Sequence, residues 1–399
     1  MADDRRDGRY VSTGHLPSPR QVQLAVDEAY RMYRSEDGGA TSQTYPALAR
    51  VPGQLFGICV AGIGGNTYRV GDAGHEFTIM SVAKPFVFAL VCQLLGAEQV
   101  RHKLGVNATG LAFNSLAFVE RSTDGRSNPM VNAGAIAATS LVPGDDSAAK
   151  WQFIREGLSG FAGRDLALSD EVYASASATN YHNRAIANLL ASRGRIYADP
   201  AEAIDLYTRQ SCLLTSAEDL AVMSATLADG GVNPVTGLRV VAPAVCQHVL
   251  AVMATAGMYE TSGDWLFDVG VPGKSGIAGG IIAVSPGKGG LGDVLPAAGP
   301  SREQRQGPAG CQAPVQDAGT EPVRLHRTRV VPVRRPPGQP FRMRVHVGGL
   351  GLTRATGASA RGPGAPWRPD RRAPRPGRWH PATARRKRRR SARRHNGPG

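Results

Sequence analysis

The chain has 399 residues, of which 42% are hydrophobic and 20% are charged. This apolar content is enough to bury a large core and excludes a wholly disordered protein, and the length predicts two domains or one large domain with a lobe. No apolar run approaches the roughly 20 residues of a membrane span, and the opening MADDRRDGRY has no apolar signal region. We therefore expect a cytoplasmic protein with no membrane partner.

Cysteine and histidine usage bears on cofactors. The five cysteines are widely spaced and include no Cys-x-x-Cys pair, which fits reduced thiols better than a disulfide framework or a zinc site. The nine histidines form no cluster with the spacing of metal ligands. We expect neither a metal nor an organic cofactor.

The formal charge of +15 is concentrated near the C-terminus. Residues 291–399 hold 24 Lys and Arg against 5 Asp and Glu, whereas the first 290 residues hold 23 against 27. Residues 293–399 are also rich in Pro and Gly, which predicts a disordered tail. Three interpretations stay open for it. They are an arm that binds nucleic acid through Arg385–Arg394, a solvated tail without a partner, and a GC-rich gene read out of frame.

The body divides into predicted elements in chain order. After a flexible stretch at residues 1–18, apolar spacing predicts a helix from Pro19 that ends by Gly38. A hairpin is expected next, with strands at residues 56–60 and 67–70 around a glycine-rich turn. A helix that is apolar on nearly all sides, and therefore buried, follows from about residue 81 to 95.

The rest of the body is mostly helical from about residue 100 to 250, and strand character returns after Gly263. Strands, a long helical region and strands again predict an α+β fold, in which a helical lobe is inserted between two parts of one antiparallel sheet with flanking helices. We place this domain at residues 19–292. Its sheet parts are expected at about 45–80 and 263–292.

Ser81-Val82-Ala83-Lys84 opens the predicted buried helix. A spacing of three places the hydroxyl and the amine on one helical face. In an apolar setting the lysine amine is desolvated, so its neutral form is favoured and it can remove the serine proton. A capping serine followed by a solvated lysine would give the same pattern without chemistry.

Lys274-Ser275-Gly276 starts a strand-like segment far along the chain. Ser-x-x-Lys followed by Lys-Ser/Thr-Gly is typical of serine β-lactamases and penicillin-binding proteins. Their middle motif, Ser-Asp-Asn, is absent, although Asn132 lies between the two motifs. The pair predicts a serine–lysine acyl-transfer site.

Six segments carry a closer resemblance. They are EFTIMSVAKPF, NPMVNAGAI, HNRAIANLL, LYTRQSCL, GMYETSGDW and VGVPGKSGIAGGI. In order and spacing they resemble the serine-dependent glutaminase family over residues 20–292. The resemblance implies a β-lactamase/transpeptidase-like fold, a homo-oligomer (dimer or tetramer), and hydrolysis of L-glutamine to L-glutamate and ammonia through a Ser-Lys dyad and an acyl-enzyme.

The resemblance also implies residue roles. Ser81 would attack the side-chain amide with Lys84 as its base, and the backbone N–H groups of Ser81 and Ile277 would hold the oxyanion. Tyr259 would assist proton transfer to the leaving ammonia, and Tyr45 matches a family tyrosine expected at the catalytic centre. The residues that would hold the amino-acid end of the substrate are Asn132, Asn183 and Tyr207.

Three features depart from the family pattern. Ala176 stands where the family has a glutamate that pairs with the α-ammonium of the substrate, which implies weak glutamine binding. The usual Tyr-Ile-Pro is shortened to Tyr45-Pro46. The match stops near Gly292, where family members continue, so we expect uncovered apolar surface, lower stability and a tendency to associate.

Two alternative functions stay open. A β-lactamase or penicillin-binding-like acyl hydrolase would share the serine and both lysines, but the missing export signal argues against substrates outside the cytoplasm. An inactive body whose basic tail binds nucleic acid would show salt-sensitive DNA binding that is lost when residues 293–399 are deleted.

Overall fold

The computed structural model describes residues 17–35 and 41–295. All of them lie in the first of two compact units, Met1–Arg329, and the second, Val330–Gly399, lies outside the described residues. The predicted N-terminal stretch and the predicted tail fall outside this part too, apart from residues 17–18 and 293–295. The three interpretations of the tail therefore remain predictions.

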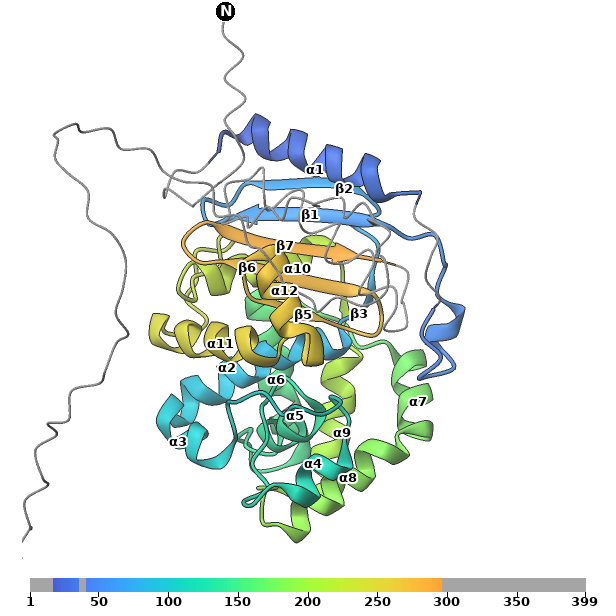
Figure 1. The fold of residues 1–399 in the computed structure, drawn as a ribbon, viewed down its shortest axis with the longest axis vertical. Coiled ribbons are helices and arrows are strands. Elements are labelled where there is room, and N and C mark those ends of the chain that lie inside the picture. Colours follow the sequence, from blue (N-terminus) through green and yellow to red (C-terminus); the bar gives the residue numbers. More distant parts are fainter. Residues whose placement is uncertain (1–16, 36–40, 296–399) are drawn as a thin grey trace, which may run out of the picture. The chain divides into compact units, whose positions relative to one another are not determined.

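A five-stranded antiparallel sheet organises the described chain (Figure 1). Its strand order is β2-β1-β7-β6-β5, and β3 pairs with β4 in a separate two-stranded sheet. β1 pairs with β2 on one side and with β7 on the other, so Cys59 lies opposite both Arg69 and Gly292. The strands are β1 (Gly57–Gly62), β2 (Thr67–Gly71), β3 (Phe77–Thr78), β4 (Leu214–Thr215), β5 (Gly273–Ser275), β6 (Gly280–Ser285) and β7 (Gly289–Val294).

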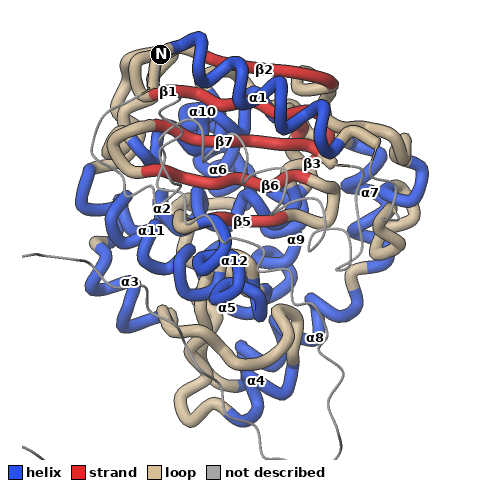
Figure 2. Tube along the Cα trace, turned by 45° about the horizontal axis from the view of Figure 1, so that its top comes forward, coloured by secondary structure: helices blue, strands red, loops and turns tan. Residues whose placement is uncertain are grey.

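Helices cover both faces of this sheet, and most of them form the region between β3 and β5 (Figures 1 and 2). The α-helices of the described residues are α1 (Pro19–Tyr33), α2 (Ala83–Leu95), α3 (Ala97–Lys103), α4 (Leu116–Arg121), α5 (Asn132–Thr139), α6 (Ser147–Ala162), α7 (Asp170–Thr179), α8 (Tyr181–Ser192), α9 (Pro200–Ser211), α10 (Ala217–Ala228), α11 (Pro243–Ala256) and α12 (Ser262–Val269). The predicted α+β fold with an inserted helical lobe is confirmed.

α1 packs on the outer face of β1 and β2 (Figure 2). It begins with a capping box in which the side chains of Ser18 and Gln21 each bond the backbone N–H of the other residue. Val22, Val26 and Ala29 recur at helical spacing and are buried in the same cluster as Ile58 and Val60 of β1. This amphipathic pattern explains why the predicted N-terminal helix forms.

α10 packs against the opposite face of the sheet, closest to β7. Gly290 permits this contact, because a Cβ at that position would lie 2.3 Å from the Cβ of Ser224. All of α10 apart from Glu218 is buried, since the helix lies between the sheet and the helical lobe. With a larger residue in place of Gly290, α10 could not pack this close to β7.

Two sequence predictions need correction. Residues 262–269, expected to begin the second sheet part, form α12, and strand structure starts only at Gly273. Trp265 and Val269 are four residues apart and buried, whereas Phe267 is 63% exposed, so the period there is helical; Gly270, at φ 82°, ends the helix. In the first part, β3 belongs to the small second sheet.

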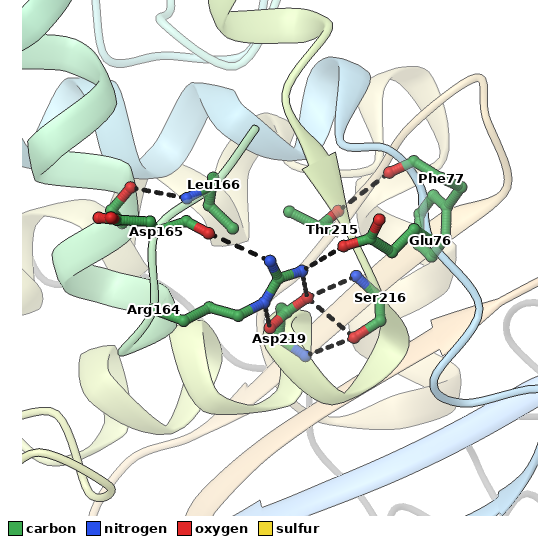
Figure 3. Close-up of polar contacts among 9 residues, drawn as sticks. Glu76, Phe77, Arg164, Asp165, Leu166, Thr215, Ser216 and Asp219 are labelled. Atoms are coloured by element: carbon green, nitrogen blue, oxygen red, sulfur yellow. Dashed lines mark hydrogen bonds and ion pairs between the residues drawn. The ribbon is translucent and has the colours of Figure 1, made fainter. Parts of the chain in front are cut away.

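Arg164 ties the lobe to the sheet region (Figure 3). It follows α6, and its Nε and Nη2 atoms donate to the two carboxylate oxygens of Asp219 at 2.8 and 2.7 Å. Nη2 also donates to Glu76, just before β3, at 2.9 Å. The same Asp219 forms the capping box of α10 with Ser216. Three segments far apart in sequence are thus fixed around one guanidinium group.

No single helix in the described part of the chain is both long and apolar enough to cross a membrane. Met80–Leu95 and Ala97–Lys103 reach the required composition only as a pair, and they bend by 115° relative to each other.

Candidate active site

Ser81 lies in a 3₁₀ turn, Met80–Val82, immediately before α2. Met80 has φ 46°, a left-handed conformation that costs a side-chain-bearing residue energy and often marks a functional site. The turn is held from outside, because the N–H of Ile79 donates to the carbonyl of Leu213 at 2.9 Å. A strained, supported turn thus presents the half-buried serine.

The Lys-Ser-Gly motif runs beside this turn. A Cβ on Gly276 would lie 3.1 Å from the carbonyl oxygen of Ile79 and 3.5 Å from the backbone nitrogen of Ser81. Only glycine fits this approach without displacing its neighbours. The next residue, Ile277, is half-buried.

Lys84 is 2% exposed and donates from Nζ to Oδ1 of Asn132 at 2.6 Å. Burial holds the pKa of its amine well below the ordinary value, and the positive charge of Lys274 lowers it further. The described hydrogen bonds include none between Ser81 and Lys84. Lys84 is therefore a desolvated amine with access to its neutral form, the state that a general base requires.

The ring of Tyr259 lies close to both lysines. Nζ of Lys274 is 3.8 Å from the centroid of the Tyr259 ring and donates to the carbonyl of Ser275 at 2.7 Å. Nζ of Lys84 is 5.6 Å from the same ring. Tyr259 has φ 57° and stacks on Phe113 with centroids 4.5 Å apart. The contact with Lys274 is a cation–π interaction, and the same ring lies near the amine of Lys84, so one tyrosine is close to both motifs.

A chain of side-chain hydrogen bonds leads away from Lys84. Nδ2 of Asn132 donates to Oδ1 of Asn183 at 3.0 Å, and Nδ2 of Asn183 donates to Oδ1 of Asn180 at 2.6 Å. Nδ2 of Asn180 donates to Oγ1 of Thr208 at 3.0 Å. All four residues are buried. Because these amides are paired, their burial is tolerated.

Two tyrosines near this chain stay protonated. The hydroxyl of Tyr207 donates to Oδ1 of Asn132 at 3.3 Å, and burial raises its pKa well above the ordinary value, helped by Tyr45 and Tyr259. Burial also raises the pKa of Tyr45 to about 12, with a smaller contribution from Cys212. Both phenols are therefore hydrogen-bond donors at neutral pH.

Most of the predicted site residues come together in this way. The contacts above join Lys84, Asn132, Asn183, Tyr207 and Tyr259, and the pKa of Tyr207 reflects the proximity of Tyr45. Ser81 lies near the Lys-Ser-Gly motif through the position of Gly276, and Ile277 is the residue that follows this glycine.

Ala176, the departure from the family pattern, is 1% exposed on α7. Its methyl group packs in the main apolar core. The position therefore supplies no charge to a substrate.

Sequence reasoning missed two members of the network. Asn180 precedes Asn183 by three residues, a spacing that often places side chains together, and this signal could have identified it. Thr208 directly follows Tyr207 and gave no signal of its own.

A cavity of about 330 Å³ lies between α7, α8 and α9. Asn180 and Thr208 form part of its wall, so the amide chain ends at this cavity. Arg184 and Asp205 also line it. Within the described residues, no group of three or more His, Cys, Asp and Glu side chains could hold a metal ion.

Comparisons with known proteins point to one family. The family model "Glutaminase" matches residues 39–312, twenty residues beyond the predicted domain end at 292. Glutaminase 2 of Yersinia pestis is 60% identical over 296 residues, covering 74% of this chain and 87% of that protein. A glutaminase of Mycobacterium ulcerans (strain Agy99) is 47% identical over 271 residues, covering 68% of this chain and 85% of that protein.

Solved structures agree. One described as the probable glutaminase ybaS has a TM-score of 0.74 and 41% identity, covering 76% of this chain and 99% of that one. Mglu in its glutamate form has a TM-score of 0.70 and 34% identity, and the match covers 76% of this chain and 69% of that one. With its antiparallel sheet, helical lobe and paired Ser-x-x-Lys and Lys-Ser-Gly motifs, the chain belongs to the glutaminase family.

Proposed function

We propose that this protein hydrolyses L-glutamine to L-glutamate and ammonia, with Ser81 as nucleophile and Lys84 as its base. The observation that supports this most is the buried amine of Lys84, three residues after a serine on a strained turn. The relatives named as glutaminases favour this reaction over that of a β-lactamase.

The proposed reaction has four steps. Lys84 takes the proton of Ser81 as the Oγ atom attacks the side-chain amide carbon. The resulting oxyanion is held by the backbone N–H groups of Ser81 and Ile277, which stabilise developing charge. The proton then passes to the leaving nitrogen with the help of Tyr259, ammonia departs, and water hydrolyses the acyl-serine by the reverse sequence.

The amino-acid end of glutamine is proposed to bind Asn132, Asn183 and Tyr207. These side chains offer amide and hydroxyl groups on the Lys84 side of the network. Tyr45 is proposed to donate a hydrogen bond near the reacting amide, since its hydroxyl stays protonated. The apolar Ala176 gives the α-ammonium no partner at that position, so binding is expected to be weak.

The proposed function is tested by ammonia release from L-glutamine over a wide concentration range, beside Ser81→Ala. Release that disappears in this variant supports the proposal. Equal release by a folded Ser81→Ala variant would overturn the role of the serine. Opening of the β-lactam ring of a penicillin, without ammonia release from glutamine, would favour the β-lactamase alternative.

Assembly and location are proposed as well. We place a homo-oligomer, a dimer or tetramer, in the cytoplasm, with residues 19–292 as its catalytic domain. Leu24 and Met32 of α1 and Phe267 of α12 are each more than half exposed, which supports association through apolar surface. Light scattering on the purified chain tests this, because a monomer at all concentrations would contradict it.

A further inference from the structure

We propose that Thr208 and Asn180 are positioning residues that set which end of the Asn132 side-chain amide faces Lys84. The inference rests on the proposed function, because it concerns how the base beside Ser81 is held. An amide side chain has one donor end and one acceptor end, so a chain of amides can transmit a direction from one end to the other.

The donor-to-acceptor direction of the hydrogen bonds along this chain is fixed at Thr208. Its Oγ1 lies 2.7 Å from the carbonyl oxygen of Ile204, one helical turn earlier in α9. A carbonyl can only accept, so the single hydroxyl hydrogen is committed to it. The hydroxyl oxygen can then only accept from Asn180 across 3.0 Å. The donor end of Asn180 must therefore face Thr208.

Each following orientation is determined by the one before it. With Nδ2 on Thr208, Asn180 turns Oδ1 toward Asn183 and accepts from it. Oδ1 of Asn183 is left to accept from Asn132. Oδ1 of Asn132 then faces Lys84. A backbone carbonyl on α9 thus decides which atom of Asn132 meets the catalytic amine.

The other end of the chain agrees with this direction. A lysine ammonium only donates, so its partner must be the acceptor end of Asn132. The hydroxyl of Tyr207 donates to the same oxygen. Among the described residues, the other titratable groups that face Lys84 are Lys274 from β5 and Tyr259 from the turn before α12. Neither is a carboxylate, so Oδ1 of Asn132 is the acceptor that stabilises the ammonium form.

Reversing Asn132 would change the chemistry in two ways. An N–H facing Lys84 would bond the lone pair of the neutral amine, and the hydroxyl of Ser81 needs that lone pair. The ammonium form would also lose its acceptor, so a lower pH would be required to protonate Lys84. A reversed amide should therefore lower kcat and extend activity to lower pH.

The test is Thr208→Val, which keeps the shape of the side chain and removes the hydroxyl. We expect kcat to fall about tenfold, and the acid limb of the kcat/KM profile to move to lower pH. Thr208→Ser should restore both values, because it restores the hydroxyl. The matched control is Thr226→Val on α10, a buried threonine whose hydroxyl bonds the carbonyls of Val222 and Phe161; its profile should stay unchanged.

Different outcomes separate the inference from the proposed function. A wild-type pH profile in Thr208→Val, or a loss of kcat that serine does not restore, would overturn the positioning role. Activity in Ser81→Ala would instead overturn the dyad. If Thr208→Val does not fold, neutron diffraction from the wild-type protein decides, since deuterium on Asn180 must lie toward Thr208; the reverse orientation would overturn the inference.

Discussion

Nζ of Lys274 lies 3.8 Å from the ring centroid of the half-buried Tyr259, and Nζ of Lys84 lies 5.6 Å from the same centroid. Two amines therefore lie near one ring, and they would repel each other if both were protonated. Because the charge of Lys274 lowers the pKa of Lys84, the Lys-Ser-Gly motif helps to keep the proposed base neutral. The second motif therefore acts on the first through electrostatics.

Lys274→Met should raise the pKa of Lys84, since a neighbouring positive charge is removed. Activity requires neutral Lys84, so the acid limb of kcat/KM should move to higher pH, and kcat/KM at neutral pH should fall. A pH–rate profile measures this. Lys103→Met is the matched control, because Lys103 also stacks on a tyrosine, Tyr197, at 4.2 Å. An acid limb that does not move would show that Lys274 has no influence on the base.

Ala176→Glu should raise kcat/KM for glutamine by about 30-fold or more, mainly through KM, by giving the α-ammonium a charged partner. Ala176→Gln is the control, since it has nearly the same size and no charge. Because Ala176 is buried in the apolar core, both variants should lose stability, so folding must be confirmed by thermal melting. An unchanged kcat/KM in a folded Ala176→Glu protein would show that this position does not meet the ammonium.

Lys84→Met should abolish glutamine hydrolysis and stabilise the fold by about 1–2 kcal/mol near neutral pH. Folded Lys84 has a lowered pKa, so below the ordinary lysine pKa the unfolded state binds a proton that the folded state binds only weakly. The free energy of unfolding of the wild type therefore rises as the pH approaches the ordinary lysine pKa. The gain from methionine should therefore shrink as the pH rises. Urea unfolding at two pH values checks this, and a variant less stable than the wild type at both would contradict it.

Arg164→Met should destabilise the fold by about 2 kcal/mol, because it leaves the carboxylate of Asp219, 9% exposed, without its cation. The guanidinium group is 39% exposed, and water screening keeps the loss below that of a fully buried pair. The control is Arg50→Met, which removes a more exposed ion pair with Glu171 and should have a smaller effect. Equal midpoints for the two variants in urea would contradict this.

The sequence predicted elements well where a periodic pattern was long. The hairpin at Gly57–Gly71 and the buried helix at Ala83–Leu95 both formed as expected. Short elements were harder, because α12 has about two turns and β3 has two residues. Neither is long enough to establish a period.

Some features of the candidate site were likewise predictable from the sequence, and others were not. Motif spacing predicted that Ser81, Lys84 and Lys274 belong to one site, and the structure places the two lysines near one ring. The donor-to-acceptor order of the hydrogen bonds among the buried amides could not be predicted. It depends on contacts between residues far apart in the sequence, such as Lys84 and Asn132, which are 48 positions apart. Bonds of that kind follow only from tertiary packing.

The position of β7 has a consequence for how the protein is made. β7 lies between β1 and β6, so the centre of the sheet is the last strand of the described chain to leave the ribosome. Until then β1 and β6 each have an unpaired edge, and open edges invite pairing with other chains. Nascent or truncated chains that lack residues 289–294 should therefore depend on chaperones, whatever the condition of their catalytic residues.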